Sequence, residues 1–201
     1  MKIILLDYGT GNLQSVKNAI EHLGFPVLRT SSSHDIHDAD LVIFPGQGSF
    51  GPAMKKLEEM NCIEPLKSHI QSRQPFIGIC LGFQLLFEHS EEAPNQLGLG
   101  TFEGHFKKFT NSQFPVPHMG WNAISTSHTE SVLDQFNNER FYFVHSYYLP
   151  STNAPGHAKT NYGTNFISAI ANETQLITQF HPEKSGDVGL ALLETFLNQL
   201  P

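Results

Sequence analysis

The stretch from residue 76 to residue 87 constrains the fold of this chain more than any other. It begins with a short apolar run, which is typical of a β-strand buried on both faces. From Gly82 onward the apolar residues recur with helical spacing. Cys80 lies at this junction, with Gly78 and Gly82 two residues away on either side. This Gly-x-Cys-x-Gly pattern predicts a strained strand-to-helix turn that presents the thiol beyond the sheet edge.

The surroundings of Cys80 favour a reactive thiol. The flanking glycines leave room for a substrate carbonyl and allow backbone angles that a β-carbon would resist. The helix that follows would direct its N-terminus at Cys80, where partial positive charge favours the thiolate, the nucleophilic form. The alternative is that Cys80 is a small buried apolar residue, as cysteines at strand ends commonly are. The pattern alone leaves both interpretations open.

Three further apolar segments predict strands before this one: residues 2–6, 27–29 and 41–44. Segments with helical spacing separate these strands, and a strand–helix–strand order favours a parallel, doubly wound sheet. Ligands of such sheets bind beyond the carboxyl ends of the strands. We therefore expect the chemistry in the loops after Leu6, Phe44 and Ile79.

The loop after Phe44 is rich in glycine. Gly46, Gly48 and Gly51 can leave several backbone N–H groups free to point at one spot, which suits an oxyanion or a phosphate. No Gly-Lys-Ser or Gly-Lys-Thr follows, so the loop is not a phosphate-binding P-loop. An ordinary flexible turn is the alternative, because glycine marks many plain turns.

Residues 97–162 have a different pattern, in which aromatic and β-branched residues alternate with polar ones. This pattern predicts antiparallel strands and loops appended to the parallel core. Residues 117–122, which hold the only tryptophan, are interpreted as a binding loop or a folded corner. The chain as a whole is predicted to be one α/β domain over residues 1–201, with a central, mostly parallel sheet flanked by helices and an antiparallel extension.

A predicted strand over residues 176–180 ends at His181-Pro182-Glu183. On an extended backbone, residues i and i+2 project to the same side, so His181 and Glu183 can reach a common point. A histidine near a thiol can take its proton, while a carboxylate holds the imidazole in the required tautomer. A surface turn is the alternative. Together, the cysteine turn, the glycine loop and this pair supply the nucleophile, oxyanion donors and oriented base of acyl transfer.

Composition excludes several other classes. The net charge of −7, without a basic cluster, argues against nucleic acid or an anionic membrane as a partner. No apolar run reaches the length of a membrane span, and the apolar run at the N-terminus is too short for a signal peptide. Cys62 and Cys80 are interpreted as free thiols in a reducing, cytoplasmic compartment. The eleven histidines lack metal-ligand spacing, so neither a metal nor a cofactor is predicted.

These residues resemble the triad-type (class I) glutamine amidotransferases over essentially the whole chain. The similar segments are residues 7–12, 45–48, 78–84, 117–122, 144–147 and 181–185. The cysteine and His-Pro-Glu motifs are shared by many amidotransferases. The His-Met-Gly-Trp-Asn and Glu-Lys-Ser segments look most similar to the branch that serves as the glutaminase subunit of imidazole glycerol phosphate synthase.

The resemblance implies hydrolysis of glutamine to glutamate and ammonia. Cys80 would form a γ-glutamyl thioester, His181 would be the acid and base, and Glu183 would orient the imidazole. The residues implied to hold the oxyanion and the glutamine are Gly46, Gly48, Leu81, Gln84, Ser146 and Tyr147.

The resemblance also implies a partner. Free amines are largely protonated at neutral pH, and an ammonium ion has no lone pair for attack. The family branch couples the glutaminase to a (β/α)8-barrel synthase as a heterodimer, in which ammonia helps to form imidazole glycerol phosphate and aminoimidazole carboxamide ribonucleotide during histidine biosynthesis. The residues implied to lie at the interface are Asn12, Trp121, Tyr142 and Lys184.

Three alternatives to this function differ in kind. The chain could be a paralogous amidotransferase that supplies ammonia to another acceptor enzyme, for instance in surface-sugar amidation. It could be a non-catalytic binding subunit, although packing alone does not require Cys80, His181 and Glu183 together. A cysteine peptidase would need a peptide cleft, of which the sequence gives no sign.

Overall fold

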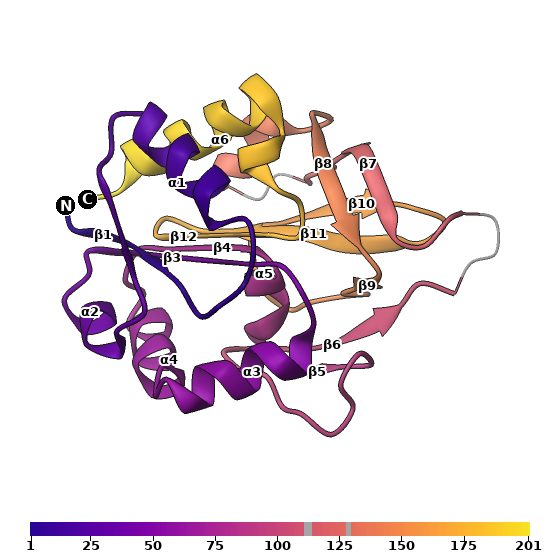
Figure 1. Ribbon diagram of the computed structural model, residues 1–201. Helices are drawn as coiled ribbons and strands as arrows, with labels where there is room; N and C mark the ends of the chain where they lie inside the picture. Colours follow the sequence, from indigo (N-terminus) through magenta and orange to yellow (C-terminus); the bar gives the residue numbers. More distant parts are fainter. Residues whose placement is uncertain (111–113, 128–129) are drawn as a thin grey trace.

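A seven-stranded sheet forms the centre of the molecule. Figure 1 shows the computed structural model, which describes residues 1–110, 114–127 and 130–201. The strand order is β10-β11-β12-β4-β3-β1-β2. The strands are β1 (Ile3–Leu6), β2 (Val27–Thr30), β3 (Leu41–Gly46), β4 (Phe76–Cys80), β10 (His157–Asn161), β11 (Asn165–Ala171) and β12 (Gln175–Thr178). The strands predicted in the first half of the chain are confirmed.

The sheet is mostly parallel, as predicted. Strands β12, β4, β3, β1 and β2 run in one direction, and β11 is antiparallel to both of its neighbours. Every residue of β1, β3 and β4 is buried, which explains why these strands are apolar throughout instead of alternating.

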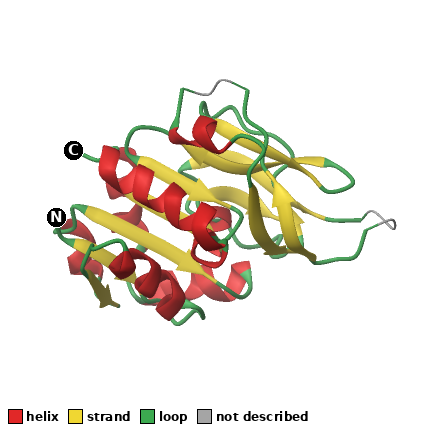
Figure 2. Cartoon of the chain, turned by 90° about the horizontal axis from the view of Figure 1, so that it is seen from above, coloured by secondary structure: helices red, strands yellow, loops and turns green. Residues whose placement is uncertain are grey.

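Helices cover both faces of this sheet (Figures 1 and 2). Helices α1 (Leu13–His22) and α6 (Gly186–Gln199) lie on one face, and α3 (Phe50–Glu59), α4 (Ile63–Gln71) and α5 (Leu81–Leu85) lie on the other. A short helix, α2 (Ser33–His37), follows β2. Successive strand residues point to opposite faces. Leu5 and Ile43 therefore belong to the core under α1 and α6, while Ile4 and Val42 belong to the other core.

The remaining strands form an extension at one end of the sheet. A two-stranded antiparallel ribbon consists of β7 (His118–Ala123) and β8 (Arg140–His145). A three-stranded sheet consists of β5 (Phe87–Ser90), β6 (Phe102–Lys108) and β9 (Tyr147–Tyr148). Short 3-10 helices are η1 (Val132–Phe136) and η2 (Pro182–Lys184). In Figure 1 the β7–β8 ribbon stands beside the carboxyl ends of the central strands.

The antiparallel pairing expected within residues 97–162 is confirmed for β6 with β9 and for β7 with β8, while β6 also pairs in parallel with β5, which precedes that range. Two expectations about these segments were wrong. The loop or corner predicted at residues 117–122 is mainly strand β7. The helix predicted through residue 87 ends at Leu85, and β5 follows at once. The spacing of Phe83 and Phe87 is explained by aromatic packing, because both rings pack edge-on against Phe106 and against each other.

Among the described residues, no helix combines the length and the apolar character that crossing a membrane requires. The single domain over residues 1–201 stays a prediction.

Gly82 fixes how closely α5 packs on the sheet. A β-carbon at this position would lie 1.8 Å from the carbonyl oxygen of Phe44. This oxygen belongs to the backbone of the central strand β3 and cannot rotate away as a flexible side chain could. The contact between Gly82 and β3 therefore sets the position of the turn that carries Cys80.

We expect Gly82→Ala to lower the free energy of unfolding by about 3 kcal/mol, at the upper end of typical overpacking costs, because the strand backbone must move. Urea denaturation of the two proteins measures the difference. Gly51→Ala is the matched control. Gly51 lies in helix α3, where alanine is favourable, and a β-carbon there would meet only Ala93, at an ordinary contact distance of 3.4 Å. Equal losses in the two variants would contradict the close contact as the cause.

Candidate active site

Cys80 occupies a strained turn at the end of β4. Its φ of 55° and ψ of −104° lie outside the regions that residues with a β-carbon prefer, and helix α5 begins at the next residue. The predicted strand-to-helix turn is therefore confirmed. Helix α5 has only five residues, so fewer aligned peptide dipoles support a thiolate than a longer helix would provide.

The sheet register brings the glycine loop, the cysteine turn and the end of β12 together. Gly46 of β3 pairs with Cys80 of β4, and Thr178 of β12 pairs with Ile79. The carboxyl ends of β3, β4 and β12 therefore meet at one edge of the sheet, as expected for a ligand site in this class of fold.

His181 and Glu183 form a buried pair at this edge. The Nδ1 atom of His181 lies 2.8 Å from Oε1 of Glu183, and the side chains are 1% and 0% exposed. Glu183 lies in the 3-10 helix η2, not on an extended strand, so the two side chains meet for a different reason from the one predicted. The side-chain amide of Asn12 also donates to Glu183 Oε1, at 2.7 Å.

The other ring nitrogen of His181, Nε2, faces away from Glu183. Within the part of the chain that the structure describes, Nε2 of His181 is buried without a hydrogen-bond partner. Burial lowers the pKa of His181, but the negative charges of Cys80 and Glu183 outweigh this effect and raise the pKa to about 10. The arrangement therefore favours an imidazolium at neutral pH.

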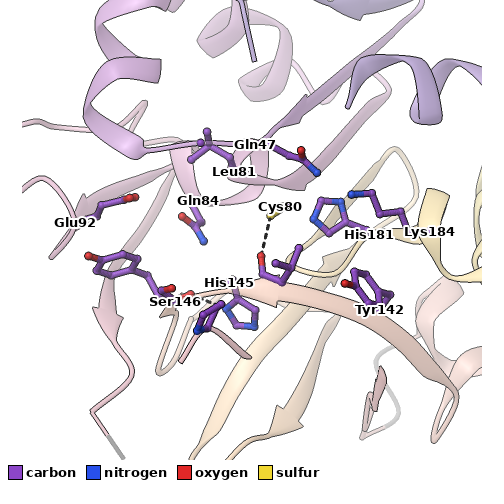
Figure 3. Close-up of a pocket in the computed structure, with 14 residues that line it drawn as sticks. Gln47, Cys80, Leu81, Gln84, Glu92, Tyr142, His145, Ser146, His181 and Lys184 are labelled. Carbon is purple, nitrogen blue, oxygen red and sulfur yellow. Dashed lines mark hydrogen bonds between the residues drawn. The ribbon is translucent and has the colours of Figure 1, made fainter. Parts of the chain in front are cut away.

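A cavity of about 440 Å³ opens above Cys80 (Figure 3). Most of the predicted site residues line it: Gly48, Cys80, Leu81, Gln84, Tyr142, Ser146, Tyr147, His181 and Lys184. Leu81 and Gln84 come from α5, and Tyr142 comes from β8 on the opposite wall. The extension and the parallel core therefore build the cavity together.

Four predicted residues stand outside this lining. Glu183 lies behind His181, on the Nδ1 side of the imidazole. Gly46 is buried, and the hydroxyl of Tyr8 occupies the space where its β-carbon would be. Asn12 lies behind the triad, on Glu183. Trp121 of β7 is 48% exposed and packs edge-on against Tyr142, with ring centroids 6.3 Å apart.

Sequence reasoning missed several residues around the thiol. The Gln179 amide donates to Cys80 Sγ at 3.8 Å and accepts from Gln84 at 3.1 Å, and the Cys80 thiol faces the Val144 carbonyl at 3.9 Å. Gln179 could have been identified from the sequence, because it lies two residues before His181 and residues i and i+2 of a strand project to the same side. Glu92 lines the cavity from a loop after β5 and also accepts from the backbone N–H of Phe50 at 3.0 Å.

No group of three or more histidine, cysteine, aspartate or glutamate side chains within residues 1–110, 114–127 and 130–201 is arranged to hold a metal ion. Cys80 and His181 line the cavity, and Glu183 lies behind the imidazole.

We expect the pKa of His181 to fall in both Glu183→Gln and Cys80→Ser, because each removes a negative charge that stabilises the imidazolium. The pKa of His181 in the folded protein lies above the ordinary value of 6.5. Protonated His181 therefore contributes to the free energy of unfolding fully below pH 6.5, and this contribution is lost as the pH rises toward 10. NMR titration of the imidazole and thermal unfolding between these values measure both effects. His157→Gln is the control, and an unchanged His181 titration in the two variants would contradict the charge coupling.

Comparisons with known proteins agree with this geometry. A family model described as "Glutamine amidotransferase class-I" matches residues 4–200. "Imidazole glycerol phosphate synthase subunit HisH" of Methanopyrus kandleri is 45% identical over 195 residues, which cover 96% of each chain. "Imidazole glycerol phosphate synthase hisHF, chloroplastic" of Arabidopsis thaliana is 46% identical over 200 residues, which cover 98% of this chain. The chain spans 34% of the length of that relative.

Solved structures of low sequence identity share the fold of this chain. One of them, "Crystal structure of glutamine amidotransferase", has a TM-score of 0.76 at 17% identity and covers 99% of this chain and 98% of its own. "Structure of PurLQS from Thermotoga maritima" has a TM-score of 0.74 at 17% identity, with 98% and 99% covered. With the family match over nearly the full length and the thiol–imidazole–carboxylate geometry, the chain belongs to the class-I glutamine amidotransferase family.

Proposed function

We propose that this protein hydrolyses glutamine and passes the ammonia to a barrel synthase that makes imidazole glycerol phosphate. The observation that carries the proposal is the arrangement of Cys80 and His181 in one cavity, with Glu183 buried behind the imidazole. The names of the relatives from Methanopyrus kandleri and Arabidopsis thaliana support the choice of pathway, which is histidine biosynthesis. Neither of these two names points to the surface-sugar alternative.

In the proposed reaction, the Cys80 thiolate attacks the side-chain amide carbon of glutamine. Backbone N–H groups at Gly48 and Leu81 stabilise the oxyanion, and His181 gives its Nε2 proton to the leaving ammonia. Water then attacks the thioester, His181 takes a proton from it, and glutamate leaves. Glu183 holds the imidazole throughout, and Asn12 holds Glu183.

Two sets of cavity-lining side chains would hold the substrate. Gln84, Ser146 and Tyr147 present polar groups to the cavity, and Gln179 fixes the amide of Gln84. Glu92 is the carboxylate among the lining residues, and glutamine carries an ammonium group at its α-carbon. We assign Glu92 to that ammonium because a buried cation requires an anionic partner.

The partner would dock over the mouth of the cavity. Trp121 and Met119 are 48% and 61% exposed on β7, beside Tyr142 and Lys184 at the cavity rim. Exposed large apolar side chains next to a catalytic cavity suit a protein interface. In the Arabidopsis thaliana relative, about two thirds of the chain lies outside the matched stretch, which leaves room for a fused partner. A reduced nucleophile also fits a cytoplasmic location, since both cysteines are free thiols.

The first test is glutamate release from glutamine by the purified chain, alone and with a cognate barrel synthase carrying its ribonucleotide ligand. We expect low activity alone, a large rise with the liganded synthase, and a loss of at least about a thousandfold in Cys80→Ala because the nucleophile is gone. Cys62→Ala is the matched control, since Cys62 is buried at the start of α4, away from the cavity. A rate of glutamate release that does not change when the synthase is added would point to another acceptor enzyme. Activity in Cys80→Ala would refute the proposed chemistry.

A second test addresses Glu92. Glu92→Gln keeps an oxygen acceptor for the Phe50 N–H but removes the charge, so the KM for glutamine should rise about tenfold or more with a smaller change in kcat. Steady-state kinetics of the complex measure both constants. Glu91→Gln is the control, because Glu91 accepts from the Lys108 N–H outside the cavity lining. The same KM in both variants would remove Glu92 from the substrate site.

A further inference from the structure

Two buried histidines lie beside the cavity and take no part in the proposed reaction. His118 of β7 is 2% exposed and His145 of β8 is 5% exposed. The antiparallel register of the β7–β8 ribbon pairs them directly. Their rings are joined by a hydrogen bond of 3.0 Å between Nδ1 of His118 and Nε2 of His145.

The neighbouring groups determine where each proton lies. Nδ1 of His145 is 2.7 Å from the carbonyl oxygen of Tyr147, which can only accept, so Nδ1 carries the proton. Nε2 of a neutral His145 must then accept, and His118 donates to it from Nδ1. Nε2 of His118 accepts in turn from the Asn122 amide at 3.3 Å.

The orientation of that amide is fixed as well. The oxygen of Asn122 accepts from the Ala123 N–H at 2.9 Å, and its nitrogen donates to the Asn161 carbonyl at 2.9 Å. The hydrogen bonds therefore form a single directed chain from Asn122 through His118 and His145 to the Tyr147 carbonyl. Each imidazole in this chain has one tautomer.

The surroundings keep both imidazoles neutral. The His118 ring is stacked between Phe143 and Tyr162, with centroid distances of 4.8 and 4.0 Å. Burial lowers the pKa of His118 to about 4 and that of His145 to about 3. The titratable groups that face the pair are His181 after β12 and Tyr162 after β10, and the charge of His181 lowers the pKa of His145 further.

The hydrogen-bond chain ends at the corner that connects β8 to β9. Ser146 and Tyr147 form this corner and line the cavity, as does His145 itself (Figure 3). The Ser146 carbonyl accepts from the Phe109 N–H at 3.0 Å, and the Tyr147 carbonyl accepts from His145. The corner is therefore held on the β6 side by the backbone and on the β7 side by the histidine chain.

We propose that His118 and His145 are positioning residues, and that their fixed hydrogen-bond chain holds the Ser146–Tyr147 corner in the geometry that binds glutamine. This inference rests on the proposed function. A neutral pair serves this role because protonating either ring would set two N–H groups against each other or against the Asn122 amide.

Two substitutions of His118 separate hydrogen bonding from packing. His118→Phe keeps an aromatic ring between Phe143 and Tyr162 but has no nitrogen to donate. His118→Asn loses the ring but places an amide nitrogen near Nδ1, from which it can donate to His145. We expect the KM for glutamine to rise about tenfold in His118→Phe, with a smaller change in kcat, and to recover in large part in His118→Asn.

Steady-state kinetics are measured in the complex with the barrel synthase, and the His145 ring nitrogens are observed by NMR of protein with nitrogen-15 histidine. The Tyr147 carbonyl should keep the Nδ1–H tautomer of His145 in His118→Phe, while the His145 Nε2 resonance should shift because it loses the hydrogen bond from His118. His69→Phe is the control, since His69 is another buried histidine that bonds a backbone carbonyl, that of Pro75, away from the cavity lining.

A raised KM with a shifted His145 Nε2 resonance supports the inference. A His118→Phe variant that loses stability like the control while keeping the wild-type KM overturns it, whatever its His145 Nε2 resonance. A wild-type complex that does not hydrolyse glutamine overturns the proposed function itself, and the kinetics of the wild type therefore distinguish the two failures.

Discussion

The backbone at Cys80 has angles that only its surroundings can hold. A φ of 55° with a ψ of −104° is costly for a residue with a side chain, so the strand before it and the helix after it must both be fixed. The fully buried strands β3 and β4 fix one side, and the contact of Gly82 with the Phe44 carbonyl fixes the other. The position of the reactive sulfur is thus a product of core packing and not of local loop structure.

The cavity contains imidazoles in two opposite electrostatic settings. His181 is buried beside Cys80 and Glu183, and their negative charges raise its pKa despite the burial. His118 and His145 are buried among aromatic rings, and their pKa values are lowered. Burial is common to all three, so the difference comes from the charged neighbours. One side chain type therefore serves proton transfer in one place and fixed hydrogen bonding in another.

The strands and the pairing of His181 with Glu183 could be predicted because their signals are local. Buried strands of parallel sheets are apolar runs, and two residues apart is a short distance on most backbones. Helix α5 was overestimated because Phe83 and Phe87 satisfy helical spacing while packing on Phe106. Glu92 and the His118–His145 pair had no local signal. Their positions depend on the loop after β5 and on the β7–β8 register.

The pairing of Gly46 with Cys80 marks the point where the cavity wall passes from a sheet strand to a loop. Up to Gly46, strand β3 is locked into the sheet register and pressed by α5, so the floor of the cavity behaves as one rigid block. Residues 47–49 follow outside the strand and are less buried, and Gly48 among them has a φ of +121°. Any adjustment of the wall that faces the sulfur is therefore concentrated in three residues. The sheet register that positions Cys80 ends before this segment.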